Sequence, residues 1–224
     1  MNFPIIDFHT HSQREQNDIV EVISLHPSKP KDKKYYTIGY HPWWTLEILS
    51  TNQLNTIKNA FLDDPFCLGL GEFGLDNLKG APMELQEKIF EQQLNIANEV
   101  NAPVVIHCVR AFDRLLRMKH ALGQTSWAVH GFVRNKTLAK QILDKGIYLS
   151  VAPHGQMNVV FEEMLKYVPL DRIFIETDSD TSCNISQRYC IFAALRNLPL
   201  EEIQEQLYIN FNHFYSSKWK YHIG

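Results

Sequence analysis

Ile5-Ile6-Asp7-Phe8-His9-Thr10-His11 is a short apolar run that ends in side chains able to bind a metal. Side chains two positions apart share one face of a strand, so Asp7, His9 and His11 point the same way. Two imidazoles and a carboxylate are costly inside an apolar barrel unless something binds them. The run therefore predicts a strand whose polar end belongs to a functional site.

Five later runs have the same design, an apolar stretch that ends in a potential ligand. They are Ile38–His41, whose role is less certain, Leu68–Glu72, Pro103–His107, Trp127–His130 and Arg172–Asp178. If the runs are parallel strands, their polar ends gather on one rim, where a (β/α)8 barrel keeps its active site. The pattern predicts an α/β fold of the TIM-barrel type, as a single domain over residues 1–224.

Past residue 45 the apolar runs alternate with amphipathic segments, as they do in βα units. Ser50 and Gln53 have the spacing of a capping box, which predicts a helix that begins near Ser50. Helical spacing of apolar residues predicts further helices, and a β-branched run predicts one more strand. The helices are expected over 83–100, 111–122, 135–145, 158–167 and about 200–216, and the strand over Ile147–Val151.

The first forty-five residues depart from this alternation. Ile19–Leu25 and Tyr35–Gly39 look like strands, but the connections Ser12–Asp18 and His26–Lys34 are too short for full crossover helices. We therefore expect a somewhat distorted barrel with its early outer helices shortened or missing. A thinly covered wall of strands would suit a homo-oligomer formed through it.

The charge of the chain limits its partners. A net charge of -3 on 224 residues offers no basic footprint for wrapping long duplex DNA. A local basic groove stays open as a hypothesis. The second early connection holds four lysines, which form either a solvated turn or a phosphate-facing patch. These are Lys29, Lys31, Lys33 and Lys34.

The cysteines indicate a reducing compartment. Cys67, Cys108, Cys183 and Cys190 are scattered and form no C-x-x-C pair, which is typical of free thiols in the cytosol. The first strand leaves no room for a signal peptide. No apolar stretch approaches the roughly 18 residues that span a bilayer. We expect a cytoplasmic protein without a membrane partner.

The strand ends supply a candidate set of metal ligands. Imidazole and carboxylate suit zinc, manganese, iron or magnesium-like ions. The set exceeds the three protein ligands usual for one catalytic ion, so we expect two divalent ions that share a carboxylate and hold a hydroxide for attack. Glu72 is the expected bridge because it lies midway in barrel order. The ligand set is His9, His11, Glu72, His107, His130 and Asp178.

Six blocks, in this order, resemble the signature blocks of the TatD family. They are Asp7-Phe-His9-Thr-His11, Gly39-Tyr-His41-Pro42, Gly71-Glu72-Phe-Gly74-Leu-Asp76, Val105-Ile-His107-Cys-Val-Arg110, His130-Gly-Phe132 and Glu176-Thr-Asp178. TatD proteins are metal-dependent hydrolases of the amidohydrolase type, and many are described as deoxyribonucleases. The resemblance implies a metal-dependent hydrolase built on a barrel.

The resemblance also implies how the ligands divide. His9, His11 and Asp178 would hold one ion, His107 and His130 the other, and Glu72 would bridge them. Asp178 would also orient or deprotonate the attacking water. Asp7 would hold a ligand imidazole by a hydrogen bond.

Arg110 and His41 are the substrate contacts that the resemblance implies. A planar guanidinium suits a phosphate, so Arg110 is expected to bind one. A salt bridge on the rim for Arg110 and a structural role for His41 remain alternative interpretations. Glu176 has the same parity as Asp178, so we expect it to face the barrel as a buried, hydrogen-bonded support.

The segment after Asp178 departs from the family pattern of small residues and a proline. Here Ser179, Asp180 and Thr181 follow. An added carboxylate at Asp180 would repel an anionic substrate. The catalytic centre therefore transfers from the family more securely than the substrate does.

Three functions follow from these residues. The first is a phosphodiesterase or deoxyribonuclease that uses water activated by two metals and acts on the ends or single strands of DNA. Trp43 or Trp44 would then stack bases, unless they only pack at the edge of the core. The alternative applies the same metal chemistry to an amide, lactone or small phosphoester, which Asp180 and the acidic net charge favour. The third binds a metal or nucleotide without turnover.

Overall fold

A computed structural model describes residues 3–12, 18–29 and 34–219 of the chain. These residues form two compact units, and each is described by itself. Unit 1 comprises Met1–Ile23 and His130–Phe214, and unit 2 comprises Ser24–Val129 and Tyr215–Gly224. That the whole chain is a single domain stays a prediction.

The strands follow the alternation that the sequence predicts. Eight strands, β1 to β8, are ordered in the sheet as they are in the chain, and the strand pairs within each unit are parallel. This order, with helices between most of the strands, is that of a (β/α)8 barrel. In the described residues between β1 and β3 there is no helix, as the short connections predict. The expected fold class is confirmed.

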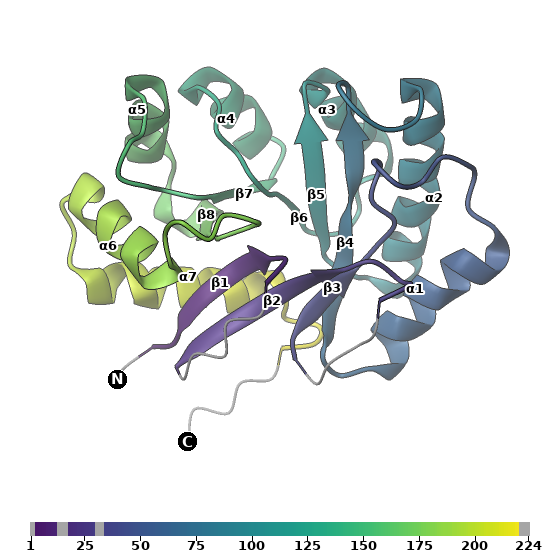
Figure 1. The fold of residues 1–224 in the computed structure, drawn as a ribbon, viewed down its shortest axis with the longest axis horizontal. Coiled ribbons are helices and arrows are strands. Elements are labelled where there is room, and N and C mark those ends of the chain that lie inside the picture. The colour runs from purple at the N-terminus through teal and green to yellow at the C-terminus, as the bar shows by residue number, and fades with distance from the viewer. Residues whose placement is uncertain (1–2, 13–17, 30–33, 220–224) are drawn as a thin grey trace. The chain divides into compact units, whose positions relative to one another are not determined.

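Unit 1 holds the first strand and the last third of the fold (Figure 1). β1 pairs with β2 from Ile5 opposite Ile19, and β7 pairs with β8 from Leu149 opposite Ile173. Its elements are β1 (Ile5–Thr10), β2 (Ile19–Leu25) as far as Ile23, α4 (Lys136–Leu143), β7 (Tyr148–Val151), α5 (Val159–Tyr167), a 3-10 turn (Leu170–Arg172), β8 (Ile173–Ile175), α6 (Ile185–Arg196) and α7 (Leu200–Phe214).

The outer face of β1 is covered, contrary to the thin wall expected there. Phe8 is fully buried, and its ring stacks on Phe174 with centroids 4.0 Å apart. Phe214 of α7 meets Phe8 edge-on at 5.4 Å, and α7 packs against β1. In the part of β2 that belongs to unit 1, Glu21 and Val22 are buried and the other residues are half-buried. The structure thus offers no bare wall at β1 for the expected homo-oligomer.

Helix α6 is an element that the sequence patterns do not predict. Its buried residues lie on one face at helical spacing, and they are Ile185, Arg188, Tyr189, Phe192 and Ala193. The set includes a charged residue, and Ile191 and Leu195 add apolar residues on other faces, so the apolar stripe is indistinct in the sequence. The signal that could have found it is local. Asn184 and Gln187 form a capping box, in which each side chain bonds the other's backbone N–H.

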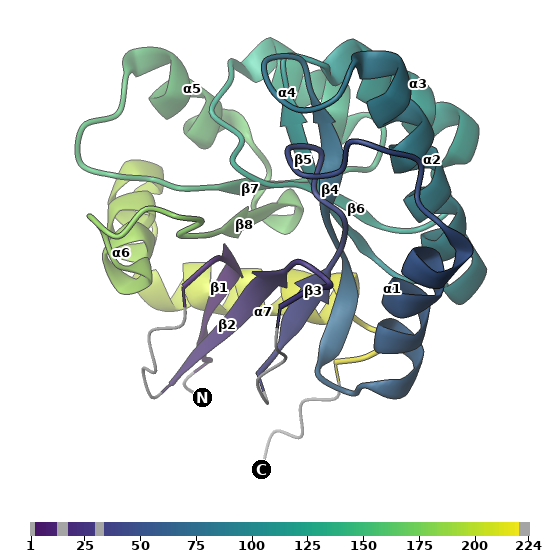
Figure 2. The same cartoon turned by 45° about the vertical axis from the view of Figure 1, so that its right-hand side comes forward.

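Unit 2 holds the middle strands and helices. Figure 2 shows α1 and α2 beside each other next to β4, and both pack on that strand. The capping box expected at Ser50 and Gln53 is confirmed at the start of α1. Its elements are β3 (Tyr36–Ile38), α1 (Thr51–Asp63), β4 (Cys67–Asp76), α2 (Met83–Val100), β5 (Val104–Val109), α3 (Phe112–Leu122) and β6 (Trp127–Val129).

Strand β4 is buried along its whole length and carries Glu72 into the interior. Gly71 makes this possible, because a Cβ there would lie 2.3 Å from the carbonyl oxygen of Val105 on β5. Its φ of +132° is also one that L side chains rarely adopt. Only glycine lets β4 approach β5 this closely beside the expected bridging ligand.

Other sequence expectations have mixed outcomes. All four cysteines are free thiols, two of them buried. Lys29 and Lys34 lie at the borders of described segments, whereas Lys31 and Lys33 lie outside the described residues, so the lysine patch stays a hypothesis. Among the described helices, none combines the length and the apolar character needed to cross a bilayer.

Candidate metal centre

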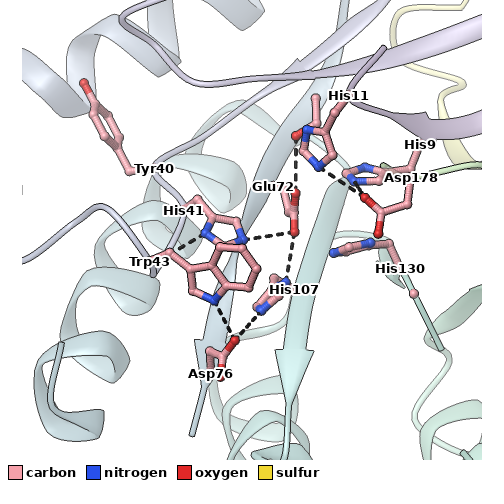
Figure 3. Close-up of polar contacts among 12 residues, drawn as sticks. His9, His11, Tyr40, His41, Trp43, Glu72, Asp76, His107, His130 and Asp178 are labelled. Atoms are coloured by element: carbon pink, nitrogen blue, oxygen red, sulfur yellow. Dashed lines mark hydrogen bonds and ion pairs between the residues drawn. The ribbon is translucent and has the colours of Figure 1, made fainter. Parts of the chain in front are cut away.

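Unit 1 gathers one set of expected ligands around Asp178. The Nε2 atom of His11 lies 3.3 Å from Oδ1 of Asp178, and Nε2 of His9 lies 4.0 Å from the same oxygen (Figure 3). The side chains of His11 and Asp178 are 36% and 34% exposed, whereas His9 is buried. The cluster is therefore open to solvent on one side.

The backbone fixes this cluster. Asp178 donates its N–H to the carbonyl of His9 at 2.9 Å, and His11 donates its N–H to the carbonyl of Asp178 at 3.2 Å. Asp178 has a φ of +50°, a left-handed conformation that is uncommon outside glycine and often marks functional sites. These bonds hold the carboxylate opposite the two imidazoles.

Asp7 holds the segment that carries Asp178. Its carboxylate accepts hydrogen bonds from the backbone N–H of Thr177 at 2.9 Å and from the Thr177 hydroxyl at 2.6 Å. Thr177 precedes Asp178, so Asp7 helps to place that ligand. Its expected bond to a ligand imidazole stays a prediction.

His130 and Glu176 lie beside this cluster in unit 1. The rings of His9 and His130 stack with centroids 4.2 Å apart, and Nδ1 of His130 lies 3.5 Å from Oε1 of Glu176. The same Oε1 accepts the N–H of Gly131 at 2.7 Å. Glu176 is thus buried and hydrogen-bonded, the arrangement that the supporting role predicts.

Unit 2 gathers a second set of groups around Glu72. Oε1 of Glu72 lies 3.0 Å from Nδ1 of His107 and 3.1 Å from Nε2 of His41. Dashed lines mark both contacts in Figure 3. The three side chains are at most 9% exposed. In contrast to the cluster at Asp178, this one is enclosed.

Asp76 holds the far side of His107, a role that sequence reasoning did not assign. Nε2 of His107 lies 2.9 Å from Oδ2 of Asp76, and the indole N–H of Trp43 donates to the same oxygen at 2.6 Å. Burial raises the pKa of Asp76, but hydrogen bonds from His107, Trp43 and the Leu78 N–H outweigh it and lower that pKa. Asp76 closes the Gly-Glu-Phe-Gly-Leu-Asp block, so its place in that block was the available signal.

This arrangement fits His107 as a metal ligand. A neutral imidazole carries one N–H, and if that N–H is donated to Asp76, the lone pair of Nδ1 on the Glu72 side is free for an ion. The carboxylate–histidine pairing is common behind metal-bound histidines. The carboxylate of Glu72 then offers a second ligand atom for an ion beside Nδ1 of His107.

His41 is buried, and its bonds are those of a residue that holds Glu72. Its Nδ1 accepts the backbone N–H of Trp43 at 3.1 Å, which leaves Nε2 to donate to Glu72. Its side chain is 7% exposed. The expected contact of His41 with substrate stays a prediction beside this structural role.

Trp43 and Trp44 differ sharply in exposure. Trp43 is half-buried and bonded to Asp76, and Lys79 lies with its ammonium 3.8 Å from the ring centroid. Trp44 is 60% exposed, with its ring centroid 4.8 Å from that of His41. Of the two, Trp44 has the face available for stacking.

Asp180 does not present an uncompensated charge, contrary to the expected repulsion. The guanidinium of the fully buried Arg188 donates to Asp180 at 2.5 Å and to the carbonyl of Pro153 at 3.1 Å. Hydrogen bonds from Ser182 and from Arg188 lower the pKa of Asp180 to about 2. The pair is neutral overall, and it ties the segments after β7 and β8 together.

Together the two clusters offer imidazole nitrogens and carboxylate oxygens and no thiolate. Within each of the sets His9–His11–Asp178 and His41–Glu72–His107, one ligand atom per residue lies within 4.8 Å of the others. Such donors at such spacing suit zinc, manganese or a similar divalent ion. The expectation that Glu72 bridges two ions involves both units and stays a prediction.

Comparison with protein families adds the decisive observation. The family described as TatD related DNase matches residues 6–216, nearly the whole chain. The chain belongs to this family. The TatD resemblance of the sequence blocks is thereby confirmed.

Named TatD relatives cover part of the chain. A 3′-5′ ssDNA/RNA exonuclease TatD from Citrobacter koseri is 29% identical over 149 residues, which are 64% of this chain and 56% of the exonuclease. The match thus spans little more than half of that relative. An uncharacterized metal-dependent hydrolase from Methanocaldococcus jannaschii is 26% identical over 82% of this chain and 76% of its own length.

Solved TatD structures share the fold. The TatD homologue YjjV from Escherichia coli K12 superposes with a TM-score of 0.77 at 21% identity, covering 95% of this chain and 98% of its own. A TatD family hydrolase from Entamoeba histolytica gives 0.73 at 16% identity, covering 96% and 99%. These TatD structures support the barrel topology.

Proposed function

We propose that this TatD family hydrolase is a phosphodiesterase that cleaves DNA at ends or in single strands. The observation that carries the proposal is the cluster of His9, His11 and Asp178, which leaves a carboxylate and an imidazole open to solvent in a family of metal-dependent hydrolases. The Citrobacter relative named as a 3′-5′ ssDNA/RNA exonuclease supports a nucleic-acid substrate.

The ligand sets suit two divalent ions, one for each cluster. Zinc, manganese or magnesium, when bound, would polarise the phosphoryl oxygen and lower the pKa of a water. His9, His11 and Asp178 would hold one ion, and Glu72 and His107 would offer donors to the other, with His130 as a further ligand. His41 and Asp76 would keep Glu72 and His107 in place.

The chain's own groups account for the rest of the chemistry. Asp178 would accept a proton from the attacking water, whose oxygen bonds to phosphorus as the bond to the leaving oxygen breaks. The leaving oxygen keeps the electron pair of that bond and would take up a proton from solvent to form the alcohol. Arg110, exposed at the end of β5, would bind a phosphate oxygen through its guanidinium. Asp7 and Thr177 would keep Asp178 oriented.

The alternative substrates lose one of the observations that favoured them. The argument for an amide, lactone or small phosphoester rested partly on an added negative charge at Asp180. Because Arg188 compensates that charge, anionic substrates are not repelled there. A cytoplasmic location remains our proposal from the cysteine pattern.

The proposal is tested by metal content and hydrolysis. We expect about two metal equivalents per chain, and cleavage of bis-p-nitrophenyl phosphate and of a 3′-labelled single-stranded oligonucleotide with zinc, manganese or magnesium. Asp178→Asn and Glu72→Ala should each lower cleavage by about 10²–10⁴-fold while the fold is kept, as measured by circular dichroism. Asp171→Asn, an exposed carboxylate in unit 1, is the matched control. Unchanged cleavage in the first two variants would contradict the proposal.

A further inference from the structure

Two cationic side chains follow neighbouring strands in unit 2. Arg110 comes directly after β5, and Lys79 comes three residues after the end of β4. The two strands pair in parallel with Asp76 opposite Val109, and the N–H of Asn77 donates to the carbonyl of Val109 at 2.9 Å. The segments that carry Lys79 and Arg110 therefore leave the sheet side by side.

Lys79 is held in place by contacts with Trp43 and Asp76. Its ammonium lies 3.8 Å from the centroid of the Trp43 ring, a cation–π distance. Its backbone N–H donates to Oδ1 of Asp76 at 3.1 Å, while the Trp43 indole N–H donates to Oδ2 of the same carboxylate. The backbone of Lys79 thus bonds Asp76 directly, and its side chain contacts Trp43, which also bonds Asp76. Asp76 is the residue that holds His107.

The loop that carries Lys79 is also fixed by a close backbone approach. Gly80 has a φ of +98°, and a Cβ there would lie 2.3 Å from the carbonyl oxygen of Pro42. Gln86 binds the loop from within, since its side-chain amide donates to the carbonyls of Lys79 at 3.1 Å and Ala81 at 2.7 Å. A cation held this way loses little conformational freedom when it binds an anion.

Arg110 has the character of a ligand-binding cation. It is exposed, and in the part of the chain that the structure describes it makes no hydrogen bond or ion pair. Its φ of +50° is a left-handed conformation that costs a non-glycine residue free energy. The rim salt bridge that was the alternative interpretation is therefore absent among the described residues.

We propose that Lys79, stacked on Trp43, forms with Arg110 a binding site for a second phosphate beside the scissile one. This deepens the proposed function and rests on it. The site takes substrates that carry at least two neighbouring phosphates, such as an oligonucleotide or a terminally phosphorylated dinucleotide. Trp43 then serves as the platform that orients Lys79 and not as a surface for stacking bases.

The test compares dinucleotides that differ by one terminal phosphate. The probes are the thymidine dinucleotide TpT, its 5′-phosphorylated form pTpT and its 3′-phosphorylated form TpTp. Binding is measured by equilibrium dialysis in the Asp178→Asn background, where turnover is suppressed, at metal concentrations that saturate this variant. Three changes are added to it, namely Lys79→Gln, Lys79→Arg and, as a matched control, Lys88→Gln on the exposed face of α2.

We expect one phosphorylated dinucleotide to bind about tenfold tighter than TpT, the size expected for one charge-assisted contact. Lys79→Gln should remove that preference, Lys79→Arg should keep it, and Lys88→Gln should leave it unchanged. The preference should weaken as salt rises, because it depends on a phosphate contact. Trp43→Phe keeps an aromatic ring but loses the bond to Asp76, and should reduce the preference only in part.

Two outcomes would overturn the inference: no preference for either phosphorylated probe, or a preference that Lys79→Gln leaves intact. A loss of folding stability in Lys79→Gln without a change in preference would mark Lys79 as a structural cover for Trp43. Hydrolysis of TpT by the unsubstituted enzyme is measured separately and tests the proposed phosphodiesterase function. Failure of that activity and failure of the second phosphate site are therefore distinguishable.

Discussion

The two ligand clusters of this protein are built in opposite ways. In unit 1, His11 and Asp178 are about one-third exposed and are held mainly by backbone bonds between the ends of β1 and β8. In unit 2, Glu72 and His107 are enclosed and are held by side chains, namely His41 on one side and Asp76 on the other. The open cluster is suited to meeting water and substrate, and the enclosed one to keeping ligands in a fixed orientation before an ion binds.

Removing one imidazole from each cluster should give the largest contrast. His107→Ala leaves the buried carboxylates of Glu72 and Asp76 without the ring between them, so the metal-free protein should lose about 1–3 kcal/mol of unfolding free energy. His11→Ala removes a ring that is about one-third exposed and should change the unfolding free energy by less than about 0.5 kcal/mol. Urea denaturation of the metal-free proteins measures both, and equal losses would remove the distinction between the clusters.

Asp76→Asn should act on the enclosed cluster alone. An amide in place of the carboxylate weakens the bond that fixes the tautomer of His107, so affinity for one of the two metal equivalents should fall about 10–100-fold. Competition with a graded series of chelators resolves the two equivalents. A matching loss at both would show that Asp76 acts on the whole centre. Asp113→Asn, an exposed carboxylate on α3, is the control.

Metal removal should loosen the open cluster more than the enclosed one. Amides that link Asp178 and His11 to the facing backbone should exchange hydrogen faster after chelation, because the ion no longer ties their side chains. The amides of Leu78 and Lys79 should keep their protection, since Asp76 holds them without an ion. Hydrogen exchange read by mass spectrometry with and without chelator measures this. Equal changes in both sets would contradict the preorganisation of unit 2.

The stability of unit 2 away from its ligands should depend on pH. Burial lowers the pKa of Lys119 to about 8, below its ordinary value of 10.5. The unfolded chain then binds more protons than the folded one between these two values, so stability should rise with pH across that window. The difference in unfolding free energy between the unsubstituted protein and Lys119→Met isolates this residue. That difference should shift in favour of lysine as pH rises from 8 to 10, and a flat difference would contradict the shift.

Much of the candidate site was readable from short stretches of sequence. A strand places alternate residues on one face, so Asp7, His9 and His11 share a direction whatever the rest of the chain does. The same local rule applies to the run that ends at His107. Helix starts such as Ser50 follow from capping chemistry within four residues. The ligand types and the alternation of strands and helices therefore depended only on the sequence.

Contacts between distant segments required the tertiary structure. Asp76 meets Trp43 and His107 across 33 and 31 positions of the chain, and no local pattern predicts which carboxylate accepts both bonds. Arg188 lies on α6 and pairs with Asp180 in the segment after β8. The pair compensates the negative charge of Asp180, from which the sequence alone predicted repulsion of an anionic substrate. Strand periodicity sets which way a side chain points, whereas register and packing decide what it meets. The sequence thus determined the chemistry available at the strand ends, and only the fold decided which groups hold it in place.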